Sequence, residues 1–296
     1  MGNFINRFGL IIIINALIMV TISVMLNVFN IHPYMGRVGL NYGTLMIYCA
    51  VWGFGGAFIS LFLSKFMAKT MMGVQIIDPN SPQSPRALWL VQTVHRLARQ
   101  AGLANMPEVG IYDSSEMNAF ATGPSRSNSM VAVSQGLLER MTEAEVEGVL
   151  AHEVAHIANG DMVTMTLIQG VVNAFGMFLA RVIGHLLSKQ VDEDKAPMVN
   201  FIATFIFDLI FNFLGMFVVA YYSRQREYRA DKGAATFGSR DKMIAALKRL
   251  QTEMTPPPTE QSPLATMQIS NRKEGWLSLL STHPSLENRI AKLQSF

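Results

Sequence analysis

Four long apolar stretches constrain the fold of this chain more than any other feature of its sequence. They cover residues 8–29, 43–64, 163–188 and 199–222. Each exceeds the roughly 20 residues with which an α-helix crosses the apolar core of a bilayer. Half of the 296 residues are hydrophobic and only 15% are charged, as is typical of a membrane protein. The sequence therefore predicts four transmembrane helices in a lipid bilayer.

Three features of these stretches predict how they behave. The first stretch follows Arg7 and lacks a small-residue cleavage site after it, so we expect it to remain as an anchor. Gly53 and Ala57 have the spacing that lets two helices approach closely, although a glycine-rich span without a specific partner has the same spacing. Arg181 and Asp208 lie at similar depths in the third and fourth stretches, where pairing would reduce the cost of burying each charge. The alternative for Arg181 is to extend toward the lipid headgroups.

Positive charge is concentrated on one side of the predicted membrane. The loop before residue 43 contains only Arg37 as a strong base, and the loop at 189–198 mixes both signs. Loops rich in Lys and Arg stay in the cytoplasm, so both termini are expected there. Basic residues follow the second stretch (Lys65, Lys69, Arg86, Arg96, Arg99) and the fourth (Arg224, Arg226, Arg229, Lys232).

Charge and cysteine content exclude other classes of partner and fold. The net charge is +3, and most of the basic residues lie beside the predicted membrane, where anionic headgroups would attract them. No basic patch interleaved with aromatic residues is present, so we expect no nucleic-acid partner. Cys49 is the only cysteine, which excludes an internal disulfide and fits a domain in a reducing compartment. Nothing in the sequence fixes the oligomeric state, and a homo-oligomer stays open.

Residues 152–156 read His-Glu-Val-Ala-His, a spacing that suits a water-activating zinc ion. On a helix, His152 and His156 lie one turn apart on one face, so both imidazoles can bind the same metal. Glu153 then faces the open coordination position as a general base. Thr142 and Glu145 have capping-box spacing, which predicts a helix start just before the motif. A five-residue pattern can also arise by chance, so its context matters.

A catalytic zinc needs a third protein ligand, and Glu227 is the candidate. Asp231 lies one helical turn further on, where its carboxylate can accept the second ring N–H of a ligating histidine. A solvated, charged helix face is the alternative interpretation of this run. We predict one Zn²⁺ per chain, held by two neutral imidazoles and one carboxylate.

The order of the segments allows the two halves of this site to meet. Residues 1–64 form two membrane helices, 65–162 a cytoplasmic segment, 163–222 a membrane hairpin and 223–296 a second cytoplasmic segment. Two crossings separate the cytoplasmic segments, and an even number returns the chain to the same side. A shallow hairpin at 163–222 would satisfy the same condition.

Cap and turn signals predict a mainly α fold with a small β-sheet. Four prolines at 255–263 exclude a regular helix there and predict a loop near the mouth of the site. The predicted elements are a helix from Ser84 to about Gly102, a strand at 109–112, a hairpin of 118–121 and 130–133 around a loop at 122–129, a helix from Ser134 to about Met141, a helix around Glu227 to about Phe237, a helix at 239–254 and a helix from Ser285 to about Leu293.

These motifs resemble a known family. His152-Glu153-x-x-His156 with Glu227-x-x-x-Asp231 is similar to the gluzincin class of metallopeptidases. Three further runs resemble the HtpX-type membrane-embedded heat-shock proteases, which are related to CaaX prenyl proteases, and the likeness covers essentially the whole chain. Those runs are Asn159-Gly160-Asp161-Met162, Asn118-Ala119-Phe120 and Thr282-His283-Pro284.

The resemblance implies an α+β gluzincin-like catalytic domain on four transmembrane helices of the bacterial inner membrane. It implies that the edge strand Asn118, Ala119, Phe120 and Ala121 holds an extended substrate beside the zinc. A small sheet that only caps the helices is the alternative. His283, with Arg289 as its companion, would stabilise the oxyanion or occupy the metal in an inactive state, and a histidine without a role stays open.

The resemblance further implies a zinc metalloendopeptidase that cleaves misfolded or damaged membrane proteins under stress. Two alternatives are a dedicated regulatory or maturation protease with few substrates, and a zinc-stabilised membrane scaffold without activity. The intact Glu153 argues against the scaffold. Four spans are too few to enclose a large chamber, which argues against prenyl-protein processing.

Overall fold

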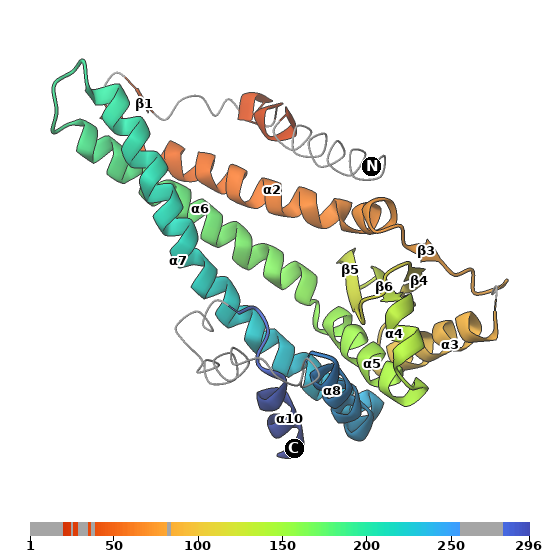
Figure 1. The fold of residues 1–296 in the computed structure, drawn as a ribbon. Helices are drawn as coiled ribbons and strands as arrows, with labels where there is room; N and C mark the ends of the chain where they lie inside the picture. Colours follow the sequence, from red (N-terminus) through yellow and green to blue (C-terminus); the bar gives the residue numbers. More distant parts are fainter. Residues whose placement is uncertain (1–19, 25, 29–34, 37–38, 82–83, 255–280) are drawn as a thin grey trace. The chain divides into compact units, whose positions relative to one another are not determined.

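A computed structural model describes residues 20–24, 26–28, 35–36, 39–81, 84–254 and 281–296 (Figure 1). Most of these residues are helical. The chain divides into two compact units, and each is described by itself. Residues 1–62 and 164–219 form the apolar unit, and residues 63–163 and 220–296 form the site unit. The predicted proline loop at 255–263 lies outside the described residues.

Three described helices are long and apolar enough to cross a membrane. They are α2 (Tyr42–Met71), α6 (Asp161–Ser188) and α7 (Ala196–Gly233), the last continuing to Glu253. They cover the predicted spans at 43–64, 163–188 and 199–222. The first predicted span, at 8–29, falls mostly outside the described residues, and of it only residues 20–24 and 26–28 are seen as helix. Three of the four predicted spans are therefore present in the described structure.

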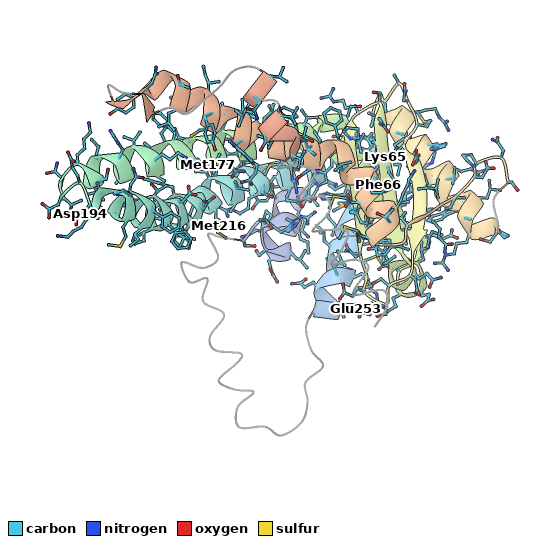
Figure 2. All side chains as sticks on the ribbon, turned by 90° about the horizontal axis from the view of Figure 1, so that it is seen from above. Lys65, Phe66, Met177, Asp194, Met216 and Glu253 are labelled. Atoms are coloured by element: carbon cyan, nitrogen blue, oxygen red, sulfur yellow. The ribbon has the colours of Figure 1, made fainter. Side chains whose placement is uncertain are left out.

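Many large apolar side chains of α6 and α7 face outward, as expected of helices in contact with lipid. Phe175 and Phe205 are each 58% exposed, and Phe201 is 74% exposed. Figure 2 shows the side chains surrounding these helices, with Met177 on α6, Met216 on α7 and Asp194 in the turn between them. A water-soluble domain would bury most of this surface.

Glycines permit close contacts between helices in the described part of the apolar unit. A Cβ on Gly53 would lie 2.6 Å from the backbone nitrogen of Ala174 and 2.8 Å from the carbonyl oxygen of Gly170. The predicted close approach at Gly53 is therefore confirmed, and its partner is α6. The predicted pairing of Arg181 with Asp208 is wrong for the described structure. Arg181 instead donates to the carbonyl of Met177 at 3.2 Å, and its guanidinium lies 5.8 Å from the ring of Tyr48.

The site unit contains a four-stranded mixed sheet in the order β3-β4-β6-β5. Its strands are β3 (Gln75–Ile76), β4 (Glu108–Tyr112), β5 (Ala119–Ser125) and β6 (Asn128–Ser134). β4 and β6 are parallel, and the other pairs are antiparallel. A separate two-stranded sheet joins β1 (Met35–Gly36) and β2 (Gly39–Leu40).

The β5–β6 hairpin is tighter than the sequence predicts. We expected a loop at 122–129, but Ser125 pairs with Asn128, so only Arg126 and Ser127 lie between the paired residues. The pairing continues past an irregularity between Thr122 and Ser125. Gly123 in this irregularity has φ 141°, a conformation that other L-residues rarely adopt. Glycine and proline here accommodate a local irregularity instead of ending the strand.

Helix caps form at the residues that the sequence predicts. Ser84, Ser134, Thr142 and Ser285 each accept a hydrogen bond from the backbone N–H three residues on. At Thr142, the Glu145 carboxylate also accepts from the Thr142 N–H at 2.8 Å, which completes the capping box. The capped helices are α3 (Pro85–Gln100), α4 (Gln135–Arg140), α5 (Glu143–Asn159) and α10 (Leu286–Gln294).

The motif helix α5 lies at the centre of the site unit. It packs against α3, α8 (Arg240–Met254), β5 and the π-helix η1 (Ala234–Ser239). Leu150, Val154 and Ile157 of α5 are fully buried in the shared hydrophobic core. A Cβ on Gly148 would lie 2.5 Å from the carbonyl oxygen of Lys242, so glycine permits α8 to pack directly on α5. This packing fixes one face of α5 and leaves its histidines on another.

The predicted span at 199–222 and the predicted helix around Glu227 are one continuous helix, α7. The C-terminal end of α7 is followed directly by the π-helix η1, where Gly238 departs from helical geometry with φ −100° and ψ −116°. A Cβ on Gly233 would meet the Cβ of Ala155 at 2.9 Å, and one on Gly238 would meet the Cβ of Ala151 at 2.8 Å. Small residues on both helices therefore bring the end of α7 close to α5.

Candidate metal centre

His152 and His156 converge on one point from successive turns of α5. Their ring centroids are 4.6 Å apart, and their Nε2 atoms are 3.1 Å apart. His152 is 6% exposed, and the His156 side chain is 12% exposed. α5 ends just past them at Gly160, which has φ 70° and closes the helix in the left-handed conformation.

Glu227 of α7 completes a group of three donors. Its side chain is 2% exposed, with Oε2 3.4 Å from the His152 Nε2 and Oε1 3.4 Å from the His156 Nε2. One donor atom from each of the three residues lies within 4.8 Å of the other two. The structure thus brings together the three residues that the sequence predicts as metal ligands.

The donor set fits a tetrahedral zinc ion. Bonds of about 2.0–2.2 Å to nitrogen and oxygen place two ligand atoms of such an ion about 3.3–3.6 Å apart. The separations of 3.1 and 3.4 Å between the donor atoms are close to this spacing. Two imidazole nitrogens and a carboxylate are also a set that zinc prefers. The residues present therefore suit the metal.

Each imidazole has a carboxylate at its outer nitrogen. Asp231 Oδ1 lies 3.0 Å from the His152 Nδ1, and Asp161 Oδ2 lies 2.7 Å from the His156 Nδ1. An Nδ1–H that donates to a carboxylate leaves the Nε2 lone pair free for a metal. The two Nε2 atoms lie 3.1 Å apart, a distance that a proton shared between them or a metal ion bound by both can bridge. With a carboxylate at each Nδ1, the two rings are arranged to bind one metal ion through Nε2.

The sequence predicts the position of Asp231 but not the contact of Asp161. Asp161 lies five residues beyond His156, after the helix has ended, so helical spacing gives no reason to place it beside that ring. The left-handed Gly160 turns the chain so that Asp161 begins α6 and faces back to His156. The signal that could have indicated it is an acidic residue directly after a glycine helix stop.

These carboxylates change the proton affinity of His156. Burial alone would lower the pKa of its imidazole. Hydrogen bonds with Asp161 and Glu227 outweigh the burial and raise this pKa to about 9. In the metal-free protein His156 is therefore charged at neutral pH, and a metal ion binding here displaces a proton.

Two arginines contact the carboxylates from outside. Arg289 of α10 donates to Asp231 through Nε at 2.8 Å and through Nη2 at 2.6 Å. Burial of Arg289 would lower the pKa of its guanidinium, but the neighbouring Asp231 raises this pKa, so the guanidinium stays charged. Arg229 lies 3.4 Å from Asp161 through one nitrogen, and its side chain is 58% exposed.

A cavity of about 920 Å³ opens onto this centre. Its lining includes Glu153 and His152 on α5, Glu227 on α7, and Asn118 and Ala119 at the start of β5. Glu153 is partly exposed there, beside the first histidine, where the sequence predicts the general base. A polypeptide in this cavity can therefore reach His152, Glu227, Glu153 and the start of the strand together.

His283 also lines the cavity but is held differently from the two histidines of α5. Its Nδ1 lies 3.1 Å from Glu227 Oε2, and its side chain is 62% exposed. It lies in the short segment before α10, where Ser281 donates a hydrogen bond to the His283 carbonyl at 2.7 Å. The structure thus places His283 at the rim of the centre.

β5 is the outer strand of the sheet, as the edge interpretation requires. Ala119 pairs with Val133 and Phe120 with Ala132, and the Ser134 N–H donates to the Asn118 carbonyl at 2.9 Å. Backbone groups in an antiparallel pair alternate in direction. The N–H and C=O of Phe120 therefore point to β6, and those of Ala119 and Ala121 point to the free edge.

Comparisons with known proteins agree with this geometry. Residues 84–296 match the model of peptidase family M48. The chain is 49% identical to a protease HtpX homolog of Bacillus subtilis over 98% of this chain and 99% of that protein. It is 46% identical to protease HtpX of Acinetobacter baumannii over 97% of both chains.

One solved structure shows the same fold at low sequence identity. The crystal structure of Ste24p from S. mikatae matches with a TM-score of 0.63 and 18% identity, and the match covers 99% of this chain. This chain spans 65% of the length of that Ste24p chain. The family match, the full-length relatives and the apolar helices lead to one conclusion: this chain is a membrane metalloprotease that belongs to peptidase family M48.

Proposed function

We propose that this protein is a membrane-bound zinc metalloendopeptidase that cleaves misfolded or damaged membrane proteins in quality control under stress. The observation that carries the proposal is the convergence of the His152, His156 and Glu227 donor atoms within 4.8 Å at a cavity that Glu153 also lines. A metal that only stabilised the fold would not need an open cavity and a carboxylate beside it.

His152, His156 and Glu227 would hold the zinc ion. When bound, the ion polarises a carbonyl group and lowers the pKa of water to about 7. Asp231 and Asp161 keep both Nδ1 atoms protonated, so that the Nε2 atoms remain ligands. Glu153 takes a proton from the attacking water and passes it to the leaving amine. His283 lies at the rim, where an imidazole N–H can donate to the oxygen of the scissile carbonyl.

The free edge of β5 is the proposed substrate-binding site. Ala119 and Ala121 direct backbone donors and acceptors outward, and an extended peptide can pair with them as an added strand. Backbone pairing reads little sequence, so it favours unfolded segments of many proteins over a single dedicated substrate. Unfolded or membrane-protein segments are thus the proposed partners, and a regulatory protease with few substrates is the alternative.

We expect Glu153→Gln to retain zinc and lose peptide-bond cleavage, because the ligands survive and the proton acceptor does not. Glu143→Gln, an exposed change at the start of the same helix, is the matched control and should keep activity. The measurement is casein cleavage together with zinc content. Cleavage by the Glu153→Gln variant at the wild-type rate would refute the assigned role. The same inactive variant, expressed in its native membrane, should accumulate uncleaved membrane proteins beside it.

Ala119→Pro is expected to abolish cleavage while zinc content and melting temperature stay unchanged. Proline removes the outward N–H of Ala119, and an edge strand tolerates proline where the N–H faces away from the sheet. Ala119→Val keeps the donor and should remain active. Phe120→Pro removes a donor to β6 and should instead lower the melting temperature. Full turnover by the Ala119→Pro protein would show that substrate is held elsewhere.

The orientation in the membrane belongs to the same proposal. Residues 1–64 and 163–222 are the membrane segments, residues 65–162 and 223–296 are cytoplasmic, and the membrane is the bacterial inner membrane. Reporters fused after residue 75 and after residue 296 should report the cytoplasm, and one near Glu193 the opposite side. A cytoplasmic signal from the Glu193 fusion would show that 163–222 does not span.

A further inference from the structure

The two carboxylates that orient the histidines have different support. Asp161 is the first residue of α6, where the helix dipole stabilises a negative charge. Asp231 lies inside a helix that continues from α7 through η1, so no helix terminus supports its charge. It is 2% exposed, and an isolated carboxylate at such a position is strongly unfavourable. Asp231 therefore depends on a partner.

Arg289 supplies that partner from a distant part of the chain. Its side chain is 9% exposed, and its Nε and Nη2 each donate to a different oxygen of Asp231, at 2.8 and 2.6 Å. A two-point contact of this kind fixes the plane of the carboxylate as well as its position. Asp231 Oδ1 lies 3.0 Å from the His152 Nδ1, and Arg289 Nη2 itself lies 3.3 Å from the same nitrogen. A guanidinium only donates, so Asp231 is the group that can accept from the His152 Nδ1–H, and its orientation decides whether that bond forms.

We propose that Arg289 is a positioning residue of the metal centre, acting on His152 through Asp231. Its guanidinium holds Asp231 in the orientation that keeps the His152 Nδ1 protonated and turns the His152 Nε2 toward the metal. The inference rests on the proposed function, because it assumes that His152 binds zinc. It gives the segment after residue 280 a part in metal binding, although the proposed ligands come from α5 and α7.

Electrostatics alone predicts the opposite effect of Arg289 on affinity. Its Nη1 lies 3.6 Å from Glu227 Oε2, so a positive charge sits close to the cation site and repels a divalent ion. If charge dominated, removing Arg289 would tighten zinc binding. If positioning dominates, removing it weakens zinc binding. The sign of the change therefore separates the two roles.

The test is a zinc titration against a competing chelator, with the full-length protein in detergent. Arg289→Met keeps an unbranched side chain but removes the positive charge and the guanidinium donors to Asp231. It should weaken zinc binding by about 10–100-fold. Arg289→Lys should also weaken it, because an ammonium cannot bind both oxygens of Asp231 in this geometry. Lys248→Met removes a charge at an exposed position of the neighbouring helix α8 and should change the affinity less than about threefold.

A double variant distinguishes action through Asp231 from an independent contribution. Asp231→Asn alone should weaken zinc binding about as much as Arg289→Met. The double variant should bind zinc no less tightly than whichever single variant has the lower affinity. Should Arg289→Met fail to fold by circular dichroism, the same comparison is made with Arg289→Lys.

Three results would overturn the role of Arg289. They are an unchanged zinc affinity, a tighter one, or losses that multiply in the double variant. Wild-type protein that binds no zinc in the same titration would instead overturn the proposed function, and the inference with it. Because the readout is metal affinity, the result does not depend on finding a substrate.

Discussion

The structure of the site depends on one buried carboxylate. Glu227 reaches both His152 and His156 at 3.4 Å while only 2% of its side chain is exposed. A negative charge at this depth requires positive partners. The guanidinium groups of Arg226 and Arg289 lie 3.4 and 3.6 Å from the Glu227 oxygens, and a divalent cation held with the two imidazoles would add a third positive charge. The small residues between the end of α7 and α5 bring Glu227 within this range, since larger side chains at Gly233 or Gly238 would meet Ala155 or Ala151. Close helix packing and metal binding are therefore coupled.

The parts of the site that follow from local geometry could be predicted from the sequence. His152, Glu153 and His156 are fixed by helical spacing, and Asp231 follows Glu227 by one turn. The caps at Thr142 and Ser285 are equally local, because each depends on a side chain and a backbone N–H three residues away.

What could not be predicted depends on tertiary structure. Asp161 reaches His156 only because Gly160 takes a left-handed conformation and α6 starts there. The contact of Arg289 with Asp231 joins residues 58 positions apart, and no periodicity relates them. The predicted Arg181–Asp208 ion pair is not formed in the described structure, although both residues line one cavity, because Arg181 donates to the carbonyl of Met177 on its own helix instead. The strands of the β5–β6 hairpin are longer, and its loop shorter, than expected because Gly123 and Pro124 lie in an irregular part of the strand and do not end it.

The central claim is that α5 and α7 together bind one zinc ion through two imidazoles and a carboxylate. X-ray absorption spectroscopy at the zinc edge of the purified full-length protein tests it most directly. The account predicts about one zinc per chain, with two imidazole nitrogens and oxygen ligands at about 2.0–2.2 Å. It also predicts the loss of one imidazole in His152→Ala. Zinc well below one per chain, a sulfur ligand, or a spectrum that His152→Ala leaves unchanged would contradict it.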